Sequence, residues 1–164
     1  MFDRCRELKI SLNLRKCIFC VPHRNLLGHI VYREGLLVDP TKVVVIVNMP
    51  PPMSAKQFHS TLGHTGYYNK FIWRYANITA PLENLLKKDK PFQWTPECDK
   101  AFETLKEKLI TKSIMIFPNW ENEFHVHVDA SRISLGAILA QPRDGDMDHP
   151  IYFVSRKLSQ DEHK

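Results

Sequence analysis

The chain has 164 residues, of which 43% are hydrophobic, and it carries a formal net charge of +5. This length supports one core of ordinary size or two small ones. The sequence has no recognisable signal peptide, no apolar stretch of membrane-spanning length and no disulfide-framework spacing among its four cysteines. These features exclude an integral membrane protein and a disulfide-stabilised secreted scaffold. We therefore expect an intracellular protein whose positive charge suits an anionic partner.

The N-terminal part of the chain predicts a helix followed by a hairpin. Apolar residues at helical spacing predict a helix over residues 3–14. Two short apolar runs at 17–21 and 26–33 predict strands, with a turn between them at 22–25. Gly28 falls inside the second run, where it fits either the close approach of another backbone or an ordinary bulge.

Two signals conflict after the hairpin. Asp39 and Pro40 are a good N-cap and first residue for a helix. The β-branched run at 43–47 favours a strand instead. The residues alone leave both structures open.

Three consecutive prolines within residues 49–53 predict a stiff, extended connector and the clearest boundary in the chain. Ser54 and Gln57 then have the spacing of a capping box, which predicts the start of a helix. Gly63 and Gly66 would each weaken that helix by roughly 1 kcal/mol relative to alanine. Their presence predicts a close crossing with another element.

This helix is expected to continue to Ile72. A shorter helix is predicted at 78–86 with Pro81 near its start, and a third begins at Thr95 and Pro96. Aromatic residues are frequent at the end of the first of these helices and just after it, and they form either packed core or a stacking platform for nucleic-acid bases: Tyr67, Tyr68, Phe71, Trp73 and Tyr75.

Strict alternation predicts a strand over residues 124–129, with histidines and Asp129 on one face and apolar residues on the other. A small-residue turn and a second apolar run at 135–140 follow, where Gly136 would let two backbones approach closely. A polar loop then precedes a third strand at 151–154. Asp129 is therefore expected at a strand end, beside a paired strand.

Three interpretations of Asp129 are open on the residues alone. Most aspartates at strand ends bond to their own backbone in a turn. A carboxylate in this position can also present oxygen to a metal ion. The third interpretation groups His125, His127 and Asp129 around one metal in a metallohydrolase, although no further ligand constellation follows at suitable spacing.

Other patterns carry weaker signals. Cys17 and Cys20 form a C-x-x-C pair that fits half a zinc site, a redox pair or two structural cysteines. The acidic loop around Asp144, Asp146 and Asp148 lacks the acidic twelfth residue of a calcium loop, so we interpret it as a solvated turn. Two basic clusters fit either solvated helix faces or a phosphate-tracking surface: Arg4, Arg6, Lys9, Arg15 and Lys16 in the first, and Lys87, Lys88 and Lys90 in the second.

Several motifs occur together in a recognisable order. They read N-M-P-P-P, F-H-S-T-L-G-H-T-G-Y-Y-N-K-F-I, A-P-L-E-N-L-L-K-K, F-Q-W-T-P-E-C-D-K-A-F-E-T-L-K, D-A-S with G-A-I-L-A-Q, and H-P-I-Y-F-V-S-R-K-L-S. Over nearly its whole length the chain resembles the polyprotein of gypsy-type LTR retrotransposons, where reverse transcriptase runs into ribonuclease H.

The resemblance implies an α+β fold in three parts. Residues 1–48 would be the C-terminal end of a reverse transcriptase palm, 49–91 a helical thumb or connection, and 92–164 the first antiparallel strands of an incomplete ribonuclease H-like fold. It favours a helix after Asp39. Ser159 and Glu162 have capping-box spacing, so we expect a helix to start near the end of the chain.

The resemblance also implies site residues and partners. Asp129 matches the first metal-binding, catalytic aspartate of ribonuclease H, while Leu27, Gly28 and His29 match the hairpin that holds the primer end. Mg²⁺ is expected in the intact parent, and none is expected to be held by this chain alone. The implied partners are an RNA–DNA hybrid or primer-template and the remainder of the polyprotein, in a cytoplasmic particle or the nucleus and without a membrane.

Two hypotheses follow. The first is a fragment of a polyprotein that performs RNA-directed DNA synthesis and hybrid cleavage, and that is inactive alone because the polymerase aspartates and most nuclease carboxylates are missing from this chain. The second is a non-catalytic nucleic-acid-binding or interaction protein derived from such an element.

Overall fold

The computed structural model describes residues 1–87, 91–111, 114–143, 145, 147–159 and 162. Its helices are α1 (Phe2–Glu7), α2 (Pro40–Val47), α3 (Ala55–Gly66), η1 (Asn69–Phe71), α4 (Tyr75–Glu83), η2 (Asn84–Leu86) and α5 (Pro96–Ile110). Its strands are β1 (His23–Leu26), β2 (His29–Tyr32), β3 (Gly35–Val38), β4 (Met115–Ile116), β5 (His125–Ala130), β6 (Ser134–Pro142) and β7 (Asp148–Lys157). The α+β class is therefore confirmed.

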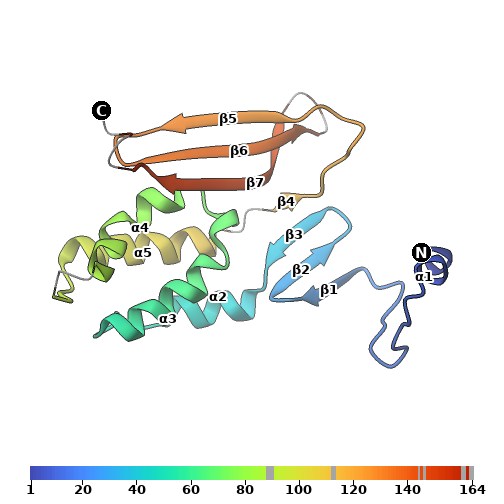
Figure 1. Ribbon diagram of the computed structural model, residues 1–164, viewed down its shortest axis with the longest axis horizontal. Helices are drawn as coiled ribbons and strands as arrows, with labels where there is room; N and C mark the ends of the chain where they lie inside the picture. Colours follow the sequence, from blue (N-terminus) through green and yellow to red (C-terminus); the bar gives the residue numbers. More distant parts are fainter. Residues whose placement is uncertain (88–90, 112–113, 144, 146, 160–161, 163–164) are drawn as a thin grey trace.

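The strands of the described residues form two antiparallel sheets. One has the order β1-β2-β3-β4 and the other the order β5-β6-β7. Figure 1 shows the second sheet lying across α4 and α5, with α2 and α3 on the far side of those helices and α1 apart from the rest of the fold. The middle helices therefore separate the β5-β6-β7 sheet from much of the N-terminal half.

The N-terminal predictions need correction. The first helix ends at Glu7, and residues 17–21 form no strand. The hairpin instead pairs β1 with β2 through a two-residue turn at Leu27 and Gly28, with Leu26 opposite His29. Both turn residues have positive φ, 51° and 74°, as a type I′ hairpin turn requires.

The helix after Asp39 is present despite its β-branched run. The Asp39 carboxylate accepts hydrogen bonds from the Thr41 amide at 2.9 Å, from the Thr41 hydroxyl at 2.8 Å and from the Asn25 side chain. Burial alone would raise the pKa of the Asp39 carboxyl, but these hydrogen bonds outweigh it and leave the pKa below its ordinary value. The Asp39 cap thus explains why this segment forms a helix although its β-branched residues favour a strand.

The proline segment at 49–53 contains neither helix nor strand, as predicted. Ser54 caps α3 through the Gln57 amide at 3.3 Å, while the Gln57 side chain accepts from the Met53 amide at 2.9 Å. The predicted close crossing at Gly63 is wrong, because a methyl group added there would meet nothing within 4 Å. The helix also ends at Gly66, short of Ile72.

The predicted cap of α5 is present, whereas α4 begins earlier than predicted. Thr95 caps α5 through the Cys98 amide at 3.4 Å, with Pro96 at the first helical position. Pro81 lies inside α4, not near its start, because that helix begins at Tyr75. The apolar face of α5 contributes to two core clusters, one shared with α2 and the segment after α3, and the other shared with α3 and α4.

The β5-β6-β7 sheet exposes one apolar face. Val126 and Val128 are each 63% exposed, and the register places them in rows with Tyr152 and Val154, which are also exposed. The opposite face carries Asp129 toward α4. The predicted third strand is longer than expected, since β7 begins at Asp148.

Ser159 and Glu162 interact as a capping box would require. The Glu162 carboxylate accepts from the Ser159 amide at 2.8 Å and from Arg156 at 2.6 Å, and Arg156 lowers the Glu162 pKa to about 2. The helix expected after this box lies outside the described residues.

Throughout the described ranges, the helices are all too short or too polar to cross a bilayer.

Candidate functional site

Asp129 lies near the end of β5, paired with Gly136 of β6. Its side chain is 38% exposed, and its Oδ2 accepts hydrogen bonds from Arg74, at 2.6 Å from Nε and also from Nη2. The two residues are 55 positions apart in the chain, so no sequence pattern pointed to this pairing. The carboxylate therefore has a fixed cationic partner within the fold.

Arg74 is held in place by its backbone and by Trp73. It precedes α4 with φ of 56°, a left-handed conformation that is uncommon for a residue other than glycine. Its guanidinium lies 5.8 Å from the Trp73 ring centroid. That ring packs against Phe153 at 5.9 Å, and a methyl group added at Gly136 would meet it at 3.4 Å. Gly136 thus makes room for the Trp73 indole, while the backbone carbonyl of its strand partner Asp129 would lie 3.8 Å from the added methyl group.

Further polar contacts join α4 to the same sheet. The Ala76 amide donates to Ser155 Oγ at 2.9 Å. The Lys157 ammonium contacts Glu83 at 2.8 Å and the Ala80 carbonyl at 3.2 Å. The ion pair of Asp129 with Arg74 is therefore one of several contacts that fix α4 to the β5-β6-β7 sheet.

The surroundings of Asp129 do not fit a two-ion site. Two-ion hydrolysis needs several converging carboxylates. In the part of the chain that the structure describes, no three His, Cys, Asp or Glu side chains lie close enough to hold a metal ion. Asp129 faces a guanidinium, so the described residues fail to fit the Mg²⁺ that the resemblance implies.

The histidines of β5 have a different partner from the one considered in the sequence. His125 Nδ1 lies 2.7 Å from Asp148 Oδ1, and His127 Nε2 lies 2.5 Å from Asp148 Oδ2. The hydrogen bond from His127, with the help of His125, lowers the Asp148 pKa below its ordinary value. Asp148 is thus bonded and not part of a solvated turn, and the structure does not bring Asp129 into this cluster; Asp144 and Asp146 lie outside the described residues.

The second candidate site is the turn between β1 and β2. Leu27 is 80% exposed at its tip. The Leu27 carbonyl accepts from Tyr67 Oη at 2.6 Å and from His29 Nδ1 at 2.9 Å, while the Gly28 carbonyl accepts from Tyr68 Oη and from the Asp39 amide, both at 3.1 Å. Side chains from the segment after α3 therefore hold the exposed tip in one conformation.

His29 lies beneath this turn and is only 6% exposed. Its ring contacts Tyr67, Tyr68 and Phe71 at centroid distances of 5.2 to 5.6 Å. Burial, with a smaller contribution from the charge on Lys70, lowers the His29 pKa. His29 thus supports the turn from below and cannot itself touch a ligand on the surface.

A pocket of about 400 Å³ opens beside the turn. Its lining includes Leu27 and Gly28 from the turn, Tyr67 and Tyr68 from the segment after α3, and the basic side chain of Lys42 from α2. The sequence pointed to Leu27 and Gly28 but missed Lys42. Tyr68 is buried in a core cluster, as one of the two interpretations of these aromatic residues predicted. In addition, the Tyr67 and Tyr68 hydroxyls donate hydrogen bonds to the turn, a role that we did not consider.

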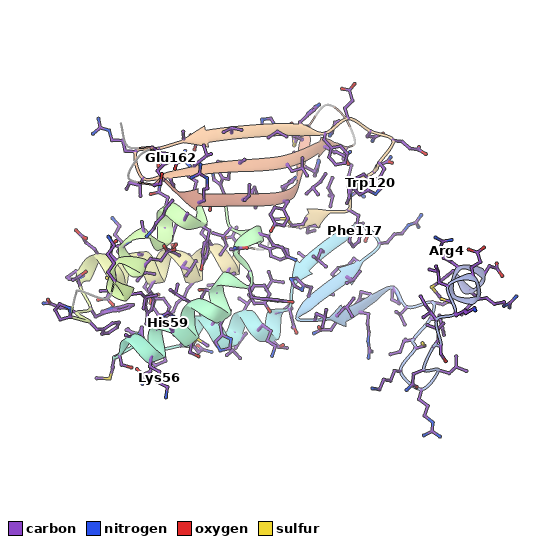
Figure 2. All side chains as sticks on the ribbon, in the orientation of Figure 1. Arg4, Lys56, His59, Phe117, Trp120 and Glu162 are labelled. Atoms are coloured by element: carbon purple, nitrogen blue, oxygen red, sulfur yellow. The ribbon has the colours of Figure 1, made fainter. Side chains whose placement is uncertain are left out.

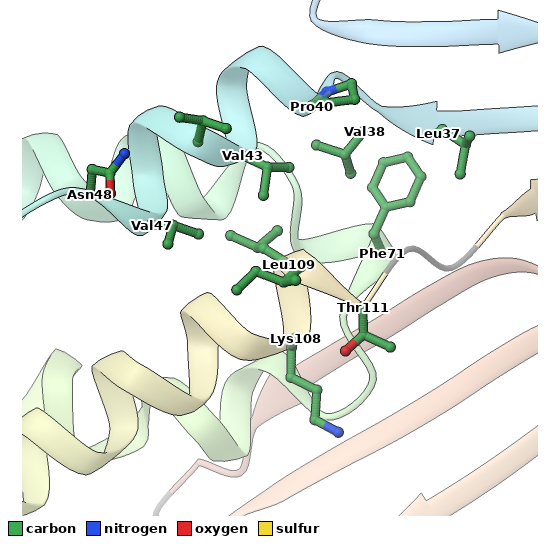
Figure 3. Close-up of a pocket in the computed structure, with 12 residues that line it drawn as sticks. Leu37, Val38, Pro40, Val43, Val47, Asn48, Phe71, Lys108, Leu109 and Thr111 are labelled. Atoms are coloured by element: carbon green, nitrogen blue, oxygen red, sulfur yellow. The ribbon is translucent and has the colours of Figure 1, made fainter.

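A separate apolar pocket of about 340 Å³ lies between α2, α5 and β3. Figure 3 shows Val43, Val47, Leu109 and Phe71 directed toward its centre, with Asn48 and Lys108 at its margin. Its lining holds no pair of groups suited to acid-base chemistry. We therefore interpret this pocket as a gap in the packing between α2 and α5.

The remaining candidates are N-terminal residues and the second basic cluster. Arg4 lies on α1, apart from the two sheets (Figure 2), and pairs with Glu7 at 2.8 Å. Cys17 and Cys20 are free thiols, with Cys20 exposed. In the second basic cluster, Lys88 and Lys90 lie outside the described residues.

Residues 94–164 match a protein family described as an RNase H-like domain found in reverse transcriptase. The chain is 39% identical over 163 residues to the retrovirus-related Pol polyprotein from transposon 297 of Drosophila melanogaster, and 35% identical over 162 residues to that from transposon 412. It is 27% identical over 159 residues to the transposon Tf2-3 polyprotein of Schizosaccharomyces pombe. These alignments cover 97–99% of this chain but only 12–15% of the relatives.

Solved structures show a similar fold. The foamy viral protease-reverse transcriptase in complex with dsDNA superposes with a TM-score of 0.76 at 20% identity, over 88% of this chain and 30% of that one. The same kind of protein in complex with an RNA/DNA hybrid gives 0.74 at 21% identity, over 87% and 19%. At these identities the likeness establishes the fold.

Proposed function

We propose that this chain guides nucleic acid through a reverse transcriptase-ribonuclease H. The chain is homologous to a segment of retrotransposon Pol polyproteins, and its residues 94–164 match a ribonuclease H-like domain. The intact parent would copy RNA into DNA and cleave the RNA–DNA hybrid. Within it, residues 1–48 would complete the palm, 49–91 would form the thumb or connection, and 92–164 would begin the ribonuclease H part. We also propose that the parent is a gypsy-type retrotransposon.

The observation that carries the proposal is the rigid turn between β1 and β2. An exposed leucine and a glycine with φ of 74° sit at its tip, with Lys42 beside them. Glycine lets a sugar-phosphate backbone approach closely, and lysine neutralises phosphate. Leu27 and Gly28 would contact the primer end, while His29 acts as their support.

Asp129 is proposed as the first nuclease carboxylate of the intact parent. Mg²⁺ in that parent would need further carboxylates beside it. The Arg74 guanidinium on Asp129 supports the proposal that this chain alone holds no Mg²⁺ and cleaves nothing. We place its action inside the cell, in a particle or the nucleus, with the rest of the polyprotein as a protein partner.

The same ion pair favours a second candidate, a nucleic-acid-binding protein without catalysis that derives from such an element. The neighbouring DNA separates the two. An upstream frame encoding Y-x-D-D and a downstream integrase would support the polyprotein, whereas an isolated expressed transcript would support the derived protein.

Leu27→Glu tests the turn directly. The new carboxylate would repel the phosphate backbone, and we expect RNA–DNA hybrid binding to weaken by about 1 kcal/mol or more, roughly fivefold in Kd. The measurement is fluorescence anisotropy with a labelled hybrid at several salt concentrations.

Met53→Glu is the matched control, since Met53 is 87% exposed and lies outside the turn pocket. It adds the same charge to the chain. Equal weakening by both variants would mean that net charge, and not the turn, governs binding.

A further inference from the structure

We propose that two copies of this chain associate through the outer edge of β5, joining their two three-stranded sheets into one. The strand order is β5-β6-β7, so β5 has β6 on one side and no strand of the described residues on the other. Figure 1 shows β5 as the strand of this sheet furthest from α5, whereas β7 lies against α4. The inference concerns a protein partner and does not depend on the proposed role in guiding nucleic acid.

The two edge strands of this sheet differ in how well they are protected. β7 contains Pro150, the basic residues Arg156 and Lys157, and a shift in its register with β6, and it is packed against α4. Such features discourage an edge strand from pairing with another chain. β5 reads H-V-H-V-D-A, without proline, lysine or arginine, and its register with β6 is unbroken. Each copy thus offers one open edge, so pairing of β5 with β5 uses both edges and closes at a dimer.

The sequence of β5 is complementary to itself in antiparallel pairing. Directly opposed residues of an antiparallel pair lie on the same face of the sheet. Pairing centred on His127 places Val126 opposite Val128 of the second copy and His125 opposite Asp129 of the second copy, and a twofold axis repeats both contacts. Val126 and Val128 are each 63% exposed in the single chain. The pairing would place these valines side by side and join the apolar faces of the two sheets.

The polar side chains of β5 retain atoms for this contact. Arg74 bonds to Oδ2 of Asp129, which leaves Oδ1 for a second donor. His125 lies 2.7 Å from Asp148 through Nδ1, which leaves Nε2. A protonated His125 would donate from Nδ1 to Asp148 and from Nε2 to Asp129 of the second copy. The dimer therefore pairs opposite charges without breaking the contacts within each chain.

Sedimentation equilibrium of the full 164-residue chain, without nucleic acid and over a range of concentrations, tests the proposal. We expect a monomer-dimer equilibrium. Val126→Lys should raise the dimer dissociation constant roughly tenfold or more, because lysine would replace a valine in both symmetric pairs at the interface. Val154→Lys is the matched control, since Val154 is 54% exposed on the same apolar face but lies in β7. It should leave the dissociation constant unchanged.

Val128→Glu tests the register of the pairing. Alone, this variant should dimerise as weakly as Val126→Lys. An equimolar mixture of the two should dimerise again, because one lysine then faces one glutamate and the other pair remains valine with valine. Both positions are exposed, so each variant should keep the circular dichroism spectrum of the unaltered chain.

Four results would overturn the proposal. A chain that stays monomeric at every concentration would leave the β5 edge to a different partner. Assemblies larger than a dimer would contradict closure at two copies. Equal weakening by Val154→Lys would place the contact on the apolar face, and a mixture that stays monomeric would contradict the register. None of these results would alter hybrid binding by the turn between β1 and β2, so they are distinct from failure of the proposed function.

Discussion

Replacing Phe102 with alanine is expected to lower the free energy of unfolding by about 3–5 kcal/mol. Phe102 is 1% exposed in α5 and packs in a cluster with Phe58, Leu82 and Cys98. Its ring also meets Trp94 at 5.9 Å. Truncation would leave a cavity between α3, α4 and α5, the helices that support the ribonuclease H-like sheet. Urea denaturation followed by circular dichroism measures the change.

Phe2→Ala is the control, because Phe2 is 55% exposed in α1. The same atoms are removed, yet we expect a loss below about 1 kcal/mol, as for ordinary surface changes. Similar losses for both variants would contradict the assignment of the core to the middle helices.

Gly35→Ala is expected to destabilise the chain by about 1–3 kcal/mol through overpacking. An added methyl group would lie 2.2 Å from the Met115 carbonyl oxygen, a backbone atom that cannot move without breaking the pairing of β3 with β4. The pairing joins the N-terminal hairpin to the segment that follows α5. Thermal unfolding and amide exchange at Met115 would report the loss.

Gly63→Ala makes the same chemical change with the opposite expected sign. This methyl group would meet nothing within 4 Å in α3, so the gain in helix propensity should stabilise the chain by about 0.5–1 kcal/mol. A loss of stability at Gly63, or none at Gly35, would contradict the packing described for these two positions.

The sequence correctly predicted the structural features that depend on contacts between residues close together in the chain. The caps at Asp39 and Thr95 follow from side chains that bond amides two or three residues away, and the structure has both helices. Alternation likewise placed Asp129 near the end of a strand. Such features need no knowledge of the rest of the fold.

The structural features that the sequence did not predict depend on contacts between residues far apart in the chain. The turn at Leu27 was missed because a leucine with positive φ has no local signature, and its carbonyl is held by Tyr67, 40 residues away. The partner of Asp129 was missed for the same reason, since Arg74 comes from another element. The family resemblance pointed to residues at both places but carried no information about their contacts.

Incubation of the purified chain with a labelled RNA–DNA hybrid and Mg²⁺ tests the central claim most directly. We expect salt-dependent binding of the hybrid and no cleavage, because Asp129 pairs with Arg74 and no group of three metal-binding side chains occurs among the described residues. Cleavage of the RNA strand that Asp129→Asn abolishes would contradict the claim that this chain is inactive alone, and failure to bind the hybrid at low salt would contradict its role in guiding nucleic acid.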